Sequence, residues 1–199
     1  SRAHVASHIA RNADALSNLL DWARTGVEHR MYNSASERAQ DISTGSTRSP
    51  QEIRTDAIDR ARNLASEVSE MTERDWAAPV RTARDRPIAA AEVPFMRVRE
   101  VWVHAVDLGA GGAAADLPRD VAVALIEDAV TSFSSREPPA AVSVTLDGGG
   151  EQFGFSGWVG YRLAEVHGSA QAVAAWLLGR SDGSGLECSG SLPELPAWL

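Results

Sequence analysis

The sequence predicts a helical domain followed by a small mixed α/β domain, and three observations support this fold class. Apolar residues recur at helical spacing through most of the first hundred residues. A glycine- and alanine-rich run, Gly109–Ala115, then breaks the composition. Beyond it, Ala141–Leu146 alternates between apolar and polar residues as a strand does. We therefore place a helical domain at residues 1–112 and an α/β domain at residues 113–199.

The first predicted helix spans about residues 2–24. Its apolar side chains fall together on a helical wheel, and its charged and amide side chains occupy the other side. Gly26 ends it, because glycine is the favoured residue just after a helix. A polar stretch follows at residues 29–49, with a short helix expected at about residues 36–41.

A second long helix begins at Ser49, where a serine cap, a proline in the first turn and Glu52 form a helix-start pattern. Apolar residues at helical spacing continue it to about Met71. Residues 75–88, which contain two prolines, are expected to be an irregular link.

Residues 93–108 are compatible with two structures. Their Val-Trp-Val-His-Ala-Val centre has strand propensity, yet the apolar residues surround a helical wheel. If this segment is a helix, it is expected to be buried and central.

The second domain is expected to contain helices and short strands. Residues 141–146 and 152–155 predict a hairpin, because Asp147-Gly148-Gly149-Gly150 between them is a turn sequence without the lysine of a phosphate loop. The other elements expected are helices at 118–133 and 169–178 and strands at 163–166 and 186–189.

Composition excludes several functional classes. The net charge is −8, and the sequence pI is about 5.1, so a nucleic-acid binder with a basic face is not expected. All nineteen basic residues are arginine, which removes Schiff-base lysine chemistry and a Walker lysine. No stretch approaches the roughly 20 consecutive apolar residues of a membrane span. We therefore expect neither nucleic acid nor membrane as a partner.

The chain has one cysteine, Cys188, which excludes an intrachain disulfide and favours a reducing cytoplasm. The first residue is Ser1 rather than methionine. We therefore expect the natural N-terminus to lie upstream of this sequence.

Three residues stand out as possible metal ligands. His8 falls inside the apolar arc of the first helix, although a single histidine there is more often a hydrogen-bonded structural residue. Glu100 and His104 are four residues apart, so on a helix they share one face. A buried carboxylate needs a cation, a metal or a proton, and catalytic zinc commonly has three protein ligands. The same spacing also occurs in ordinary helix contacts, so both interpretations stay open.

Several long blocks of this sequence resemble the mycothiol-dependent maleylpyruvate isomerases. The resemblance extends along the whole chain, including Met31-Tyr32, and its blocks are His4–Ala13, Asn18–Gly26, Met96–Gly109, Gly168-Ser169, Gly179–Gly183 and Leu192–Leu199. It implies a DinB-like four-helix bundle followed by a small α/β domain. It also implies that the first bundle helix of the family lies upstream of Ser1.

The resemblance implies a divalent metal, typically zinc, held by His8, Glu100 and His104, with His4 matching a histidine that is not a ligand. It assigns Arg180 to the active site as a catalytic and substrate-binding residue. Arg38 matches an arginine that helps to hold the substrate carboxylates. Without the resemblance, Arg180 is a charge favourable at a helix end, and Arg38 is a solvated loop residue.

The implied reaction is the cis–trans isomerisation of maleylpyruvate, a dicarboxylate keto acid of gentisate and aromatic degradation. A thiolate adds to the alkene, the resulting single bond rotates, and the thiolate leaves. Cys188 lies in a glycine-rich tail and is a poor candidate nucleophile, so the resemblance supplies mycothiol as the thiol cosubstrate. The alternatives are a mycothiol S-transferase acting on another electrophile and a non-enzymatic metal- or thiol-binding module. The sequence leaves the oligomeric state open.

Overall fold

The computed structural model describes residues 1–135, 141–156 and 163–198 of the chain. The chain divides into two compact units, Ser1–Ala110 and Gly111–Leu199. This break falls inside the glycine- and alanine-rich run. The expected division after residue 112 stays a prediction.

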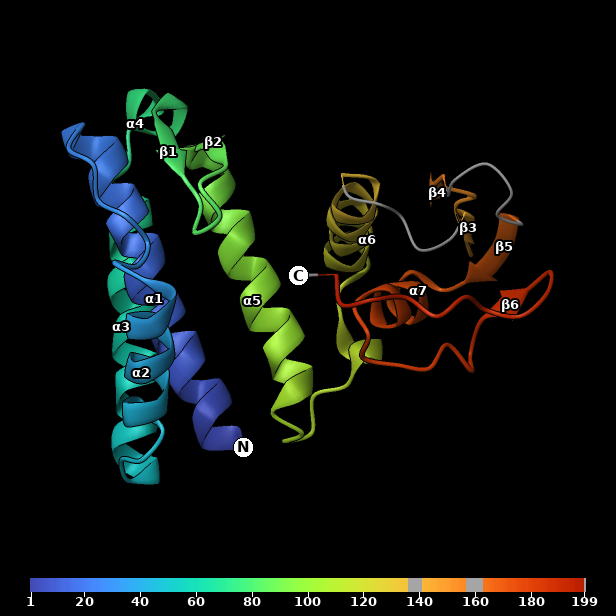
Figure 1. The fold of residues 1–199 in the computed structure, drawn as a ribbon, viewed down its shortest axis with the longest axis horizontal. Coiled ribbons are helices and arrows are strands. Elements are labelled where there is room, and N and C mark those ends of the chain that lie inside the picture. The colour runs from blue at the N-terminus through green and yellow to red at the C-terminus, as the bar shows by residue number, and fades with distance from the viewer. Residues whose placement is uncertain (136–140, 157–162, 199) are drawn as a thin grey trace. The chain divides into compact units, whose positions relative to one another are not determined.

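The first unit is built on three long helices, α1 (Arg2–Thr25), α3 (Pro50–Glu70) and α5 (Val93–Asp107), shown in Figure 1. Helix α1 contacts both of the others, so it is the central helix of this unit. It ends as expected at Gly26, whose φ of 73° is readily adopted only by a residue without a Cβ.

Residues 93–108, which the sequence left between helix and strand, form helix α5 with Pro94 in its first turn. The expectation that this helix would be buried and central is wrong. Its buried residues are Val93, Met96 and Val103, and Val101 is 42% exposed. The segment forms a helix despite the strand propensity of its valines, because it packs against α1.

Short elements complete the first unit. Helix α2 (Ala35–Gly45) is longer than the expected short helix. The link expected to be irregular instead contains most of α4 (Glu73–Ala77) and the antiparallel pair β1 (Pro79–Arg81) and β2 (Pro87–Ala89). The next element is the single-turn η1 (Ala90–Glu92). The hairpin forms because Val80 and Ile88 pair across it and are both buried.

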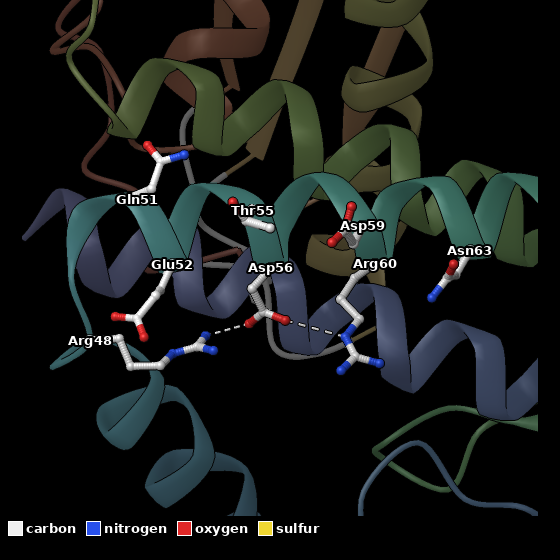
Figure 2. Close-up of a pocket in the computed structure, with 8 residues that line it drawn as sticks. All are labelled: Arg48, Gln51, Glu52, Thr55, Asp56, Asp59, Arg60 and Asn63. Atoms are coloured by element: carbon white, nitrogen blue, oxygen red, sulfur yellow. Dashed lines mark hydrogen bonds and ion pairs between the residues drawn. The ribbon is translucent and has the colours of Figure 1, made fainter.

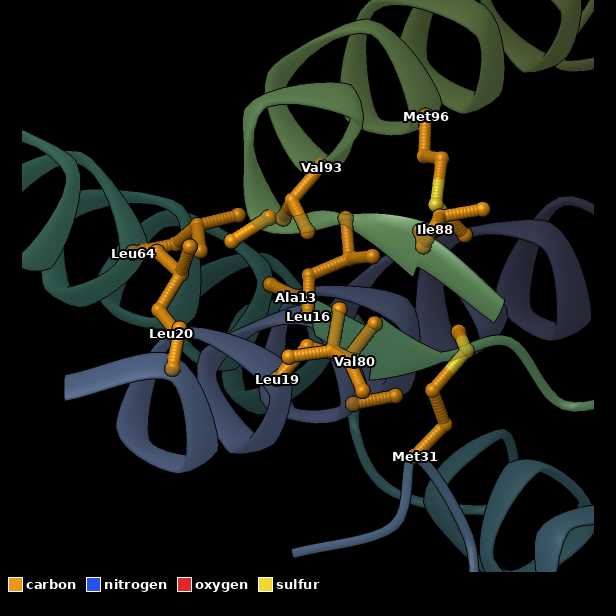
Figure 3. Close-up of a cluster of buried hydrophobic side chains, with 13 residues drawn as sticks. Ala13, Leu16, Leu19, Leu20, Met31, Leu64, Val80, Ile88, Val93 and Met96 are labelled. Atoms are coloured by element: carbon orange, nitrogen blue, oxygen red, sulfur yellow. The ribbon is translucent and has the colours of Figure 1, made fainter. Parts of the chain in front are cut away.

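The core of the first unit lies between α1, α3, the hairpin and the start of α5 (Figure 3). Leu16, Leu19 and Leu20 supply the α1 side, and none is more than 2% exposed. Other buried members are Ala13, Met31, Leu64, Val80, Ile88, Val93 and Met96. Burial of this apolar surface is the main force that holds α1 in place.

The elements of the second unit are η2 (Ala114–Asp116), α6 (Arg119–Ser134), β3 (Ala141–Leu146), β4 (Gln152–Phe155), β5 (Leu163–Gly168), α7 (Ala170–Leu177) and β6 (Glu187–Cys188). The strands form a mixed sheet in the order β4-β3-β5-β6. The central strands are parallel, and each edge strand is antiparallel to its neighbour. Phe133 on α6 and Phe155 on β4 pack with ring centroids 5.1 Å apart.

The predicted fold class is confirmed: a helical N-terminal part is followed by a small domain with a mixed sheet. Among the described residues, no helix is both long and apolar enough to cross a membrane.

Candidate metal site

Helix α1 carries His8 in its second turn. Ser1 caps the helix, with its Oγ accepting a hydrogen bond from the His4 backbone N–H at 3.3 Å. The neighbouring Ser7 is 1% exposed, and its Oγ donates to the Ile42 carbonyl at 2.9 Å, which fastens α2 against α1. His8 therefore projects from a well-anchored part of the helix, and its side chain is only 13% exposed.

Glu100 and His104 stand one turn apart on α5 and meet His8. The Glu100 Oε2 atom lies 2.9 Å from His8 Nε2 and 3.4 Å from His104 Nε2. The two imidazole rings are nearly perpendicular, with centroids 4.8 Å apart. One ligand atom from each of the three residues lies within 4.8 Å of the other two. The structure therefore brings the three predicted metal ligands together.

Glu100 is held in its ionised form by its neighbours. Burial raises the pKa of this carboxyl, but hydrogen bonds from His104 and His8 and the nearby charge of Arg99 outweigh that effect. Its pKa is consequently far below the ordinary value. An ionised carboxylate beside two imidazoles is a donor set that catalytic zinc uses in proteins.

Asp107 orients His104 from behind. Its Oδ2 atom lies 2.7 Å from His104 Nδ1, three residues earlier on α5. The hydrogen bond to Glu100 raises the pKa of His104, burial acts against it, and the hydrogen bond to Asp107 raises it further. The protonated ring donates from Nδ1 to Asp107 and from Nε2 to Glu100. When Nε2 serves as a metal ligand, the remaining hydrogen stays on Nδ1, directed at Asp107, and the Nε2 lone pair faces the metal.

Arg38 approaches the other side of His8. Its Nη2 atom lies 3.2 Å from His8 Nδ1. Because arginine can only donate, His8 Nδ1 accepts, and the hydrogen on Nε2 points at Glu100. When His8 Nε2 serves as a ligand, the hydrogen moves to Nδ1 and Arg38 loses this acceptor. The guanidinium of Arg38 is then available to another acceptor, such as a carboxylate.

Arg38 also lines a cavity of about 230 Å³, although the three candidate ligands do not line it. Its Cζ atom lies 5.3 Å from the ring centroid of Tyr32, within range of a cation–π interaction. Burial raises the pKa of Tyr32, and the adjacent Arg38 acts against that rise. Arg30 and Arg81 line the same cavity, together with Asp85. Arginine thus outnumbers acid around this opening, which suits an anionic ligand.

A larger cavity of the first unit lies elsewhere. It measures about 490 Å³ and is an open depression along α3, lined by Arg48, Gln51, Glu52, Thr55, Asp56, Asp59, Arg60 and Asn63 (Figure 2). Asp56 at its centre already pairs with Arg48 and Arg60. None of the candidate metal ligands lines it. Size alone is therefore a poor guide to the site in this protein.

Arg180 lies in the second unit, directly after α7. Its backbone N–H donates to the Ala175 carbonyl, and its Nη1 donates to the Leu178 carbonyl, each at 2.7 Å. Gly179, with a φ of 69°, makes this helix ending possible. These contacts give Arg180 a structural role at the helix end. Its predicted catalytic role stays a prediction.

Among the described residues, the remaining histidines are not part of the group of candidate ligands. His4 is exposed on α1, and His29 pairs with Asp21 at 3.3 Å. His167 is exposed on β5, where it pairs in register with Thr145 and Glu187. The expectation that His4 is not a ligand stays a prediction.

Sequence reasoning did not identify Asp107 or Tyr32 as site residues. Asp107 could have been found, because it follows His104 by three residues and so shares its helix face. Tyr32 offered no local signal, since it lies between α1 and α2 and no helical or strand period connects it with Arg38. The conformation of this connecting segment brings the two side chains together.

Comparisons with known proteins agree with the fold. A family model described as "Mycothiol maleylpyruvate isomerase N-terminal domain" matches residues 1–109. Two solved structures match the whole chain with a TM-score of 0.93, and the chain covers 82% of each. One is the crystal structure of the mycothiol-dependent maleylpyruvate isomerase, at 33% identity, and the other is a histidine-to-alanine mutant of it, at 32%. No curated protein sequence matches the chain.

Proposed function

Because the chain belongs to the mycothiol-dependent maleylpyruvate isomerase family, we propose that it converts maleylpyruvate to fumarylpyruvate with mycothiol as thiol cosubstrate. The observation that supports this most directly is the meeting of His8, Glu100 and His104, whose ligand atoms lie within 4.8 Å of one another. The enzyme would act in the cytoplasm on a product of gentisate degradation.

These three side chains fit a divalent metal, and zinc is the metal we propose. Two imidazoles and one carboxylate are a donor set of catalytic zinc, which keeps a further position for water or substrate. Asp107 behind His104 matches the carboxylate–histidine arrangement that fixes ligand histidines in metalloproteins. A metal in this position supplies a Lewis acid beside which a thiol loses its proton.

The reaction needs the cis double bond to become a single bond for a moment. The thiolate forms a bond to an alkene carbon, and the displaced electron pair moves to the ketone oxygen as an enolate. After rotation, the enolate electrons re-form the alkene in its trans geometry and the thiolate leaves. The thiolate is regenerated, and the product has the same atoms and the same oxidation state as the substrate. No oxidant or reductant is therefore required.

Arginine side chains are suited to hold this substrate. Arg38 reaches His8 on one side and an arginine-lined cavity on the other, so we assign it to a substrate carboxylate. We assign Arg180 to the enolate, because a guanidinium binds a developing oxyanion well. Replacing Arg180 by methionine should lower kcat by about 100-fold, the usual cost of losing one oxyanion donor.

A chromatographic assay tests the proposal. Purified protein is incubated with maleylpyruvate, with or without mycothiol, before and after treatment with EDTA and readdition of zinc. Formation of fumarylpyruvate that needs both thiol and metal is expected. An enzyme that forms none at saturating mycothiol, but conjugates the thiol to another electrophile, would be the S-transferase of the alternative.

A further inference from the structure

The helices that carry the candidate ligands run antiparallel, and two arginines bracket the ligand residues. Arg2 on α1 contacts the end of α5, donating from Nε to the Leu108 carbonyl at 2.8 Å and from Nη2 to the Gly109 carbonyl at 2.6 Å. Further along α1, Arg97 of α5 makes the second contact. His8 and Glu100 pair between them.

Arg97 is joined to α1 by two short hydrogen bonds. Its Nη1 atom donates to the Ile9 carbonyl and to Asn12 Oδ1, each at 2.8 Å. Asn12 is 4% exposed, and burial lowers the pKa of Arg97. Both acceptors are uncharged, so the contact depends on direction and position more than on charge neutralisation.

These partners are one turn away from the ligands on both helices. Asn12 lies four residues after His8, and Arg97 lies three residues before Glu100. Each pair shares a helix face with the ligand it neighbours. A displacement at the Arg97–Asn12 contact is therefore transmitted to the ligand atoms through a single helical turn.

Metal coordination tolerates little displacement. Ligand distances must fall within about 0.2 Å of their ideal values. If the register between α5 and α1 changes by one residue, the side chain that faces His8 is replaced by its neighbour. That neighbour lies about 1.5 Å along the helix axis and about 100° around it. The apolar contact of α5 has only three buried residues, and apolar burial is non-directional.

We propose that Arg97 and Asn12 are positioning residues that set the register of α5 against α1 for metal binding. They hold His8 at the distance from Glu100 and His104 that one ion requires. Neither residue belongs to the group of candidate ligands. This inference rests on the proposed metal site and is independent of which substrate the enzyme uses.

The first test compares zinc affinity with stability. The full chain is prepared as wild type, Asn12→Ala, Arg97→Met and Arg97→Lys, with Arg11→Met as the matched control. Arg11 links α1 to α3 through Asp56 at 2.7 Å and takes no part in the α1–α5 contact. Zinc dissociation constants are measured by competition with a chelating dye, and thermal unfolding is followed in EDTA.

Asn12→Ala and Arg97→Met are expected to bind zinc about tenfold more weakly, the lower end of the cost of losing a partner that orients ligands. Arg97→Lys should fall between them and wild type, since one ammonium can reach one of the two acceptors. Arg11→Met should keep wild-type affinity despite a lower unfolding temperature. If all variants lose affinity only in proportion to stability, the inference is overturned.

A second test reports the register without metal or substrate. Spin labels are placed at Arg24→Cys on α1 and Val101→Cys on α5, both exposed positions, in a chain that carries Cys188→Ser. Their axial separation is about 25 Å, from the rise of 1.5 Å per residue. Arg97→Met should shift or broaden the measured distance, and Arg11→Met should not. An unchanged distance contradicts the inference, whereas a changed distance in a chain that binds no zinc would refute only the metal site.

Discussion

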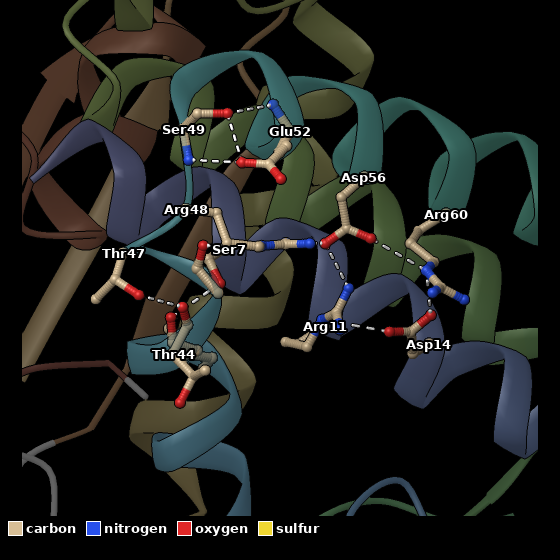
Figure 4. A network of polar contacts seen from close by, with 12 residues as sticks. Ser7, Arg11, Asp14, Thr44, Thr47, Arg48, Ser49, Glu52, Asp56 and Arg60 are labelled. Carbon is tan, nitrogen blue, oxygen red and sulfur yellow. Dashed lines mark hydrogen bonds and ion pairs between the residues drawn. The ribbon is translucent and has the colours of Figure 1, made fainter.

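The two sides of α1 both hold partly buried carboxylates, and they differ in what surrounds them. Toward α3, Asp56 meets arginines: Arg11 at 2.7 Å, Arg60 at 3.3 Å and Arg48 (Figure 4). Toward α5, Glu100 meets two histidines, at 2.9 Å and 3.4 Å. Each carboxyl has a lowered pKa, so each is ionised at neutral pH.

The partners decide what each carboxylate can do. Arginine is permanently charged and has only donors, so the arginines around Asp56 neutralise its charge and offer no ligand atoms. Imidazole can give a nitrogen lone pair, so the cluster around Glu100 can bind a metal. The α3 side is therefore suited to stability and the α5 side to chemistry.

The largest expected difference is in metal binding. Glu100→Gln should weaken zinc binding by more than about 100-fold, because even partners behind a ligand cost roughly 10- to 100-fold. Asp56→Asn should leave the zinc dissociation constant unchanged. Titration with zinc against a chelating dye measures both. Equal losses in the two variants would contradict the contrast between the two sides.

The next effect concerns Asp107, which contacts His104 Nδ1 at 2.7 Å. Asp107→Ala should weaken zinc binding by about tenfold, because His104 loses the acceptor that fixes its ring and its tautomer. The same dye competition measures the change at pH 8. Asp59→Ala, which removes an exposed α3 carboxylate, is the control and should bind zinc as wild type does.

On the α3 side, the expected loss is in stability. Asp56→Asn should lower the free energy of unfolding by about 1–2 kcal/mol, because Arg11 and Arg60 lose a charged acceptor in a partly solvated place. Urea unfolding at pH 7 in EDTA measures it. Asp59→Asn, whose side chain is 57% exposed, should change stability by less than about 1 kcal/mol. If Asp56→Asn lowers the free energy of unfolding by as little as Asp59→Asn does, the ion pairs of Asp56 contribute little to stability.

The smallest effect is in acid. Burial raises the pKa of Asp56, but hydrogen bonds from Arg48 and Arg60 and the charge of Arg11 bring it below the ordinary value of 3.8. A lowered folded pKa contributes stability above the unfolded pKa, and this is lost as the pH falls through the folded pKa. Wild type should therefore lose more stability than Asp56→Asn between pH 5 and about pH 3. If the free energy of unfolding falls equally with pH in wild type and Asp56→Asn across this range, the carboxylate of Asp56 makes no such contribution.

Much of the fold followed from local pattern. The capping sequence at Ser49 placed α3, and Gly26 ended α1 where expected. The hairpin of β1 and β2 was missed because its strands have three residues each, with only Val80 and Ile88 buried. Strands of three residues are too short to show an alternation of apolar and polar side chains. Their pairing depends on Val80 and Ile88 joining the core that α1 helps to form.

The candidate site was predicted unevenly. Glu100 and His104 could be paired from sequence because one helical turn separates them. His8 lies 92 residues from Glu100, and no local pattern connects the two. Its place in the apolar arc of its helix made it only a candidate, and the resemblance then assigned it as a ligand, as it assigned the roles of Arg38 and Arg180. Of those two arginines, Arg38 is the one that the structure brings to His8.

By itself, the sequence determined α1, α3 and the break near residue 110, because these depend on neighbours along the chain. It also determined that Glu100 and His104 share a face if residues 93–108 form a helix. Only the tertiary structure decided which carboxylate meets histidine and which meets arginine. That choice depends on how α1 lies against α3 and α5, and hydrogen bonds such as those of Arg97 act between segments 85 or more residues apart. Directional contacts at such separations leave no periodic signal in the sequence.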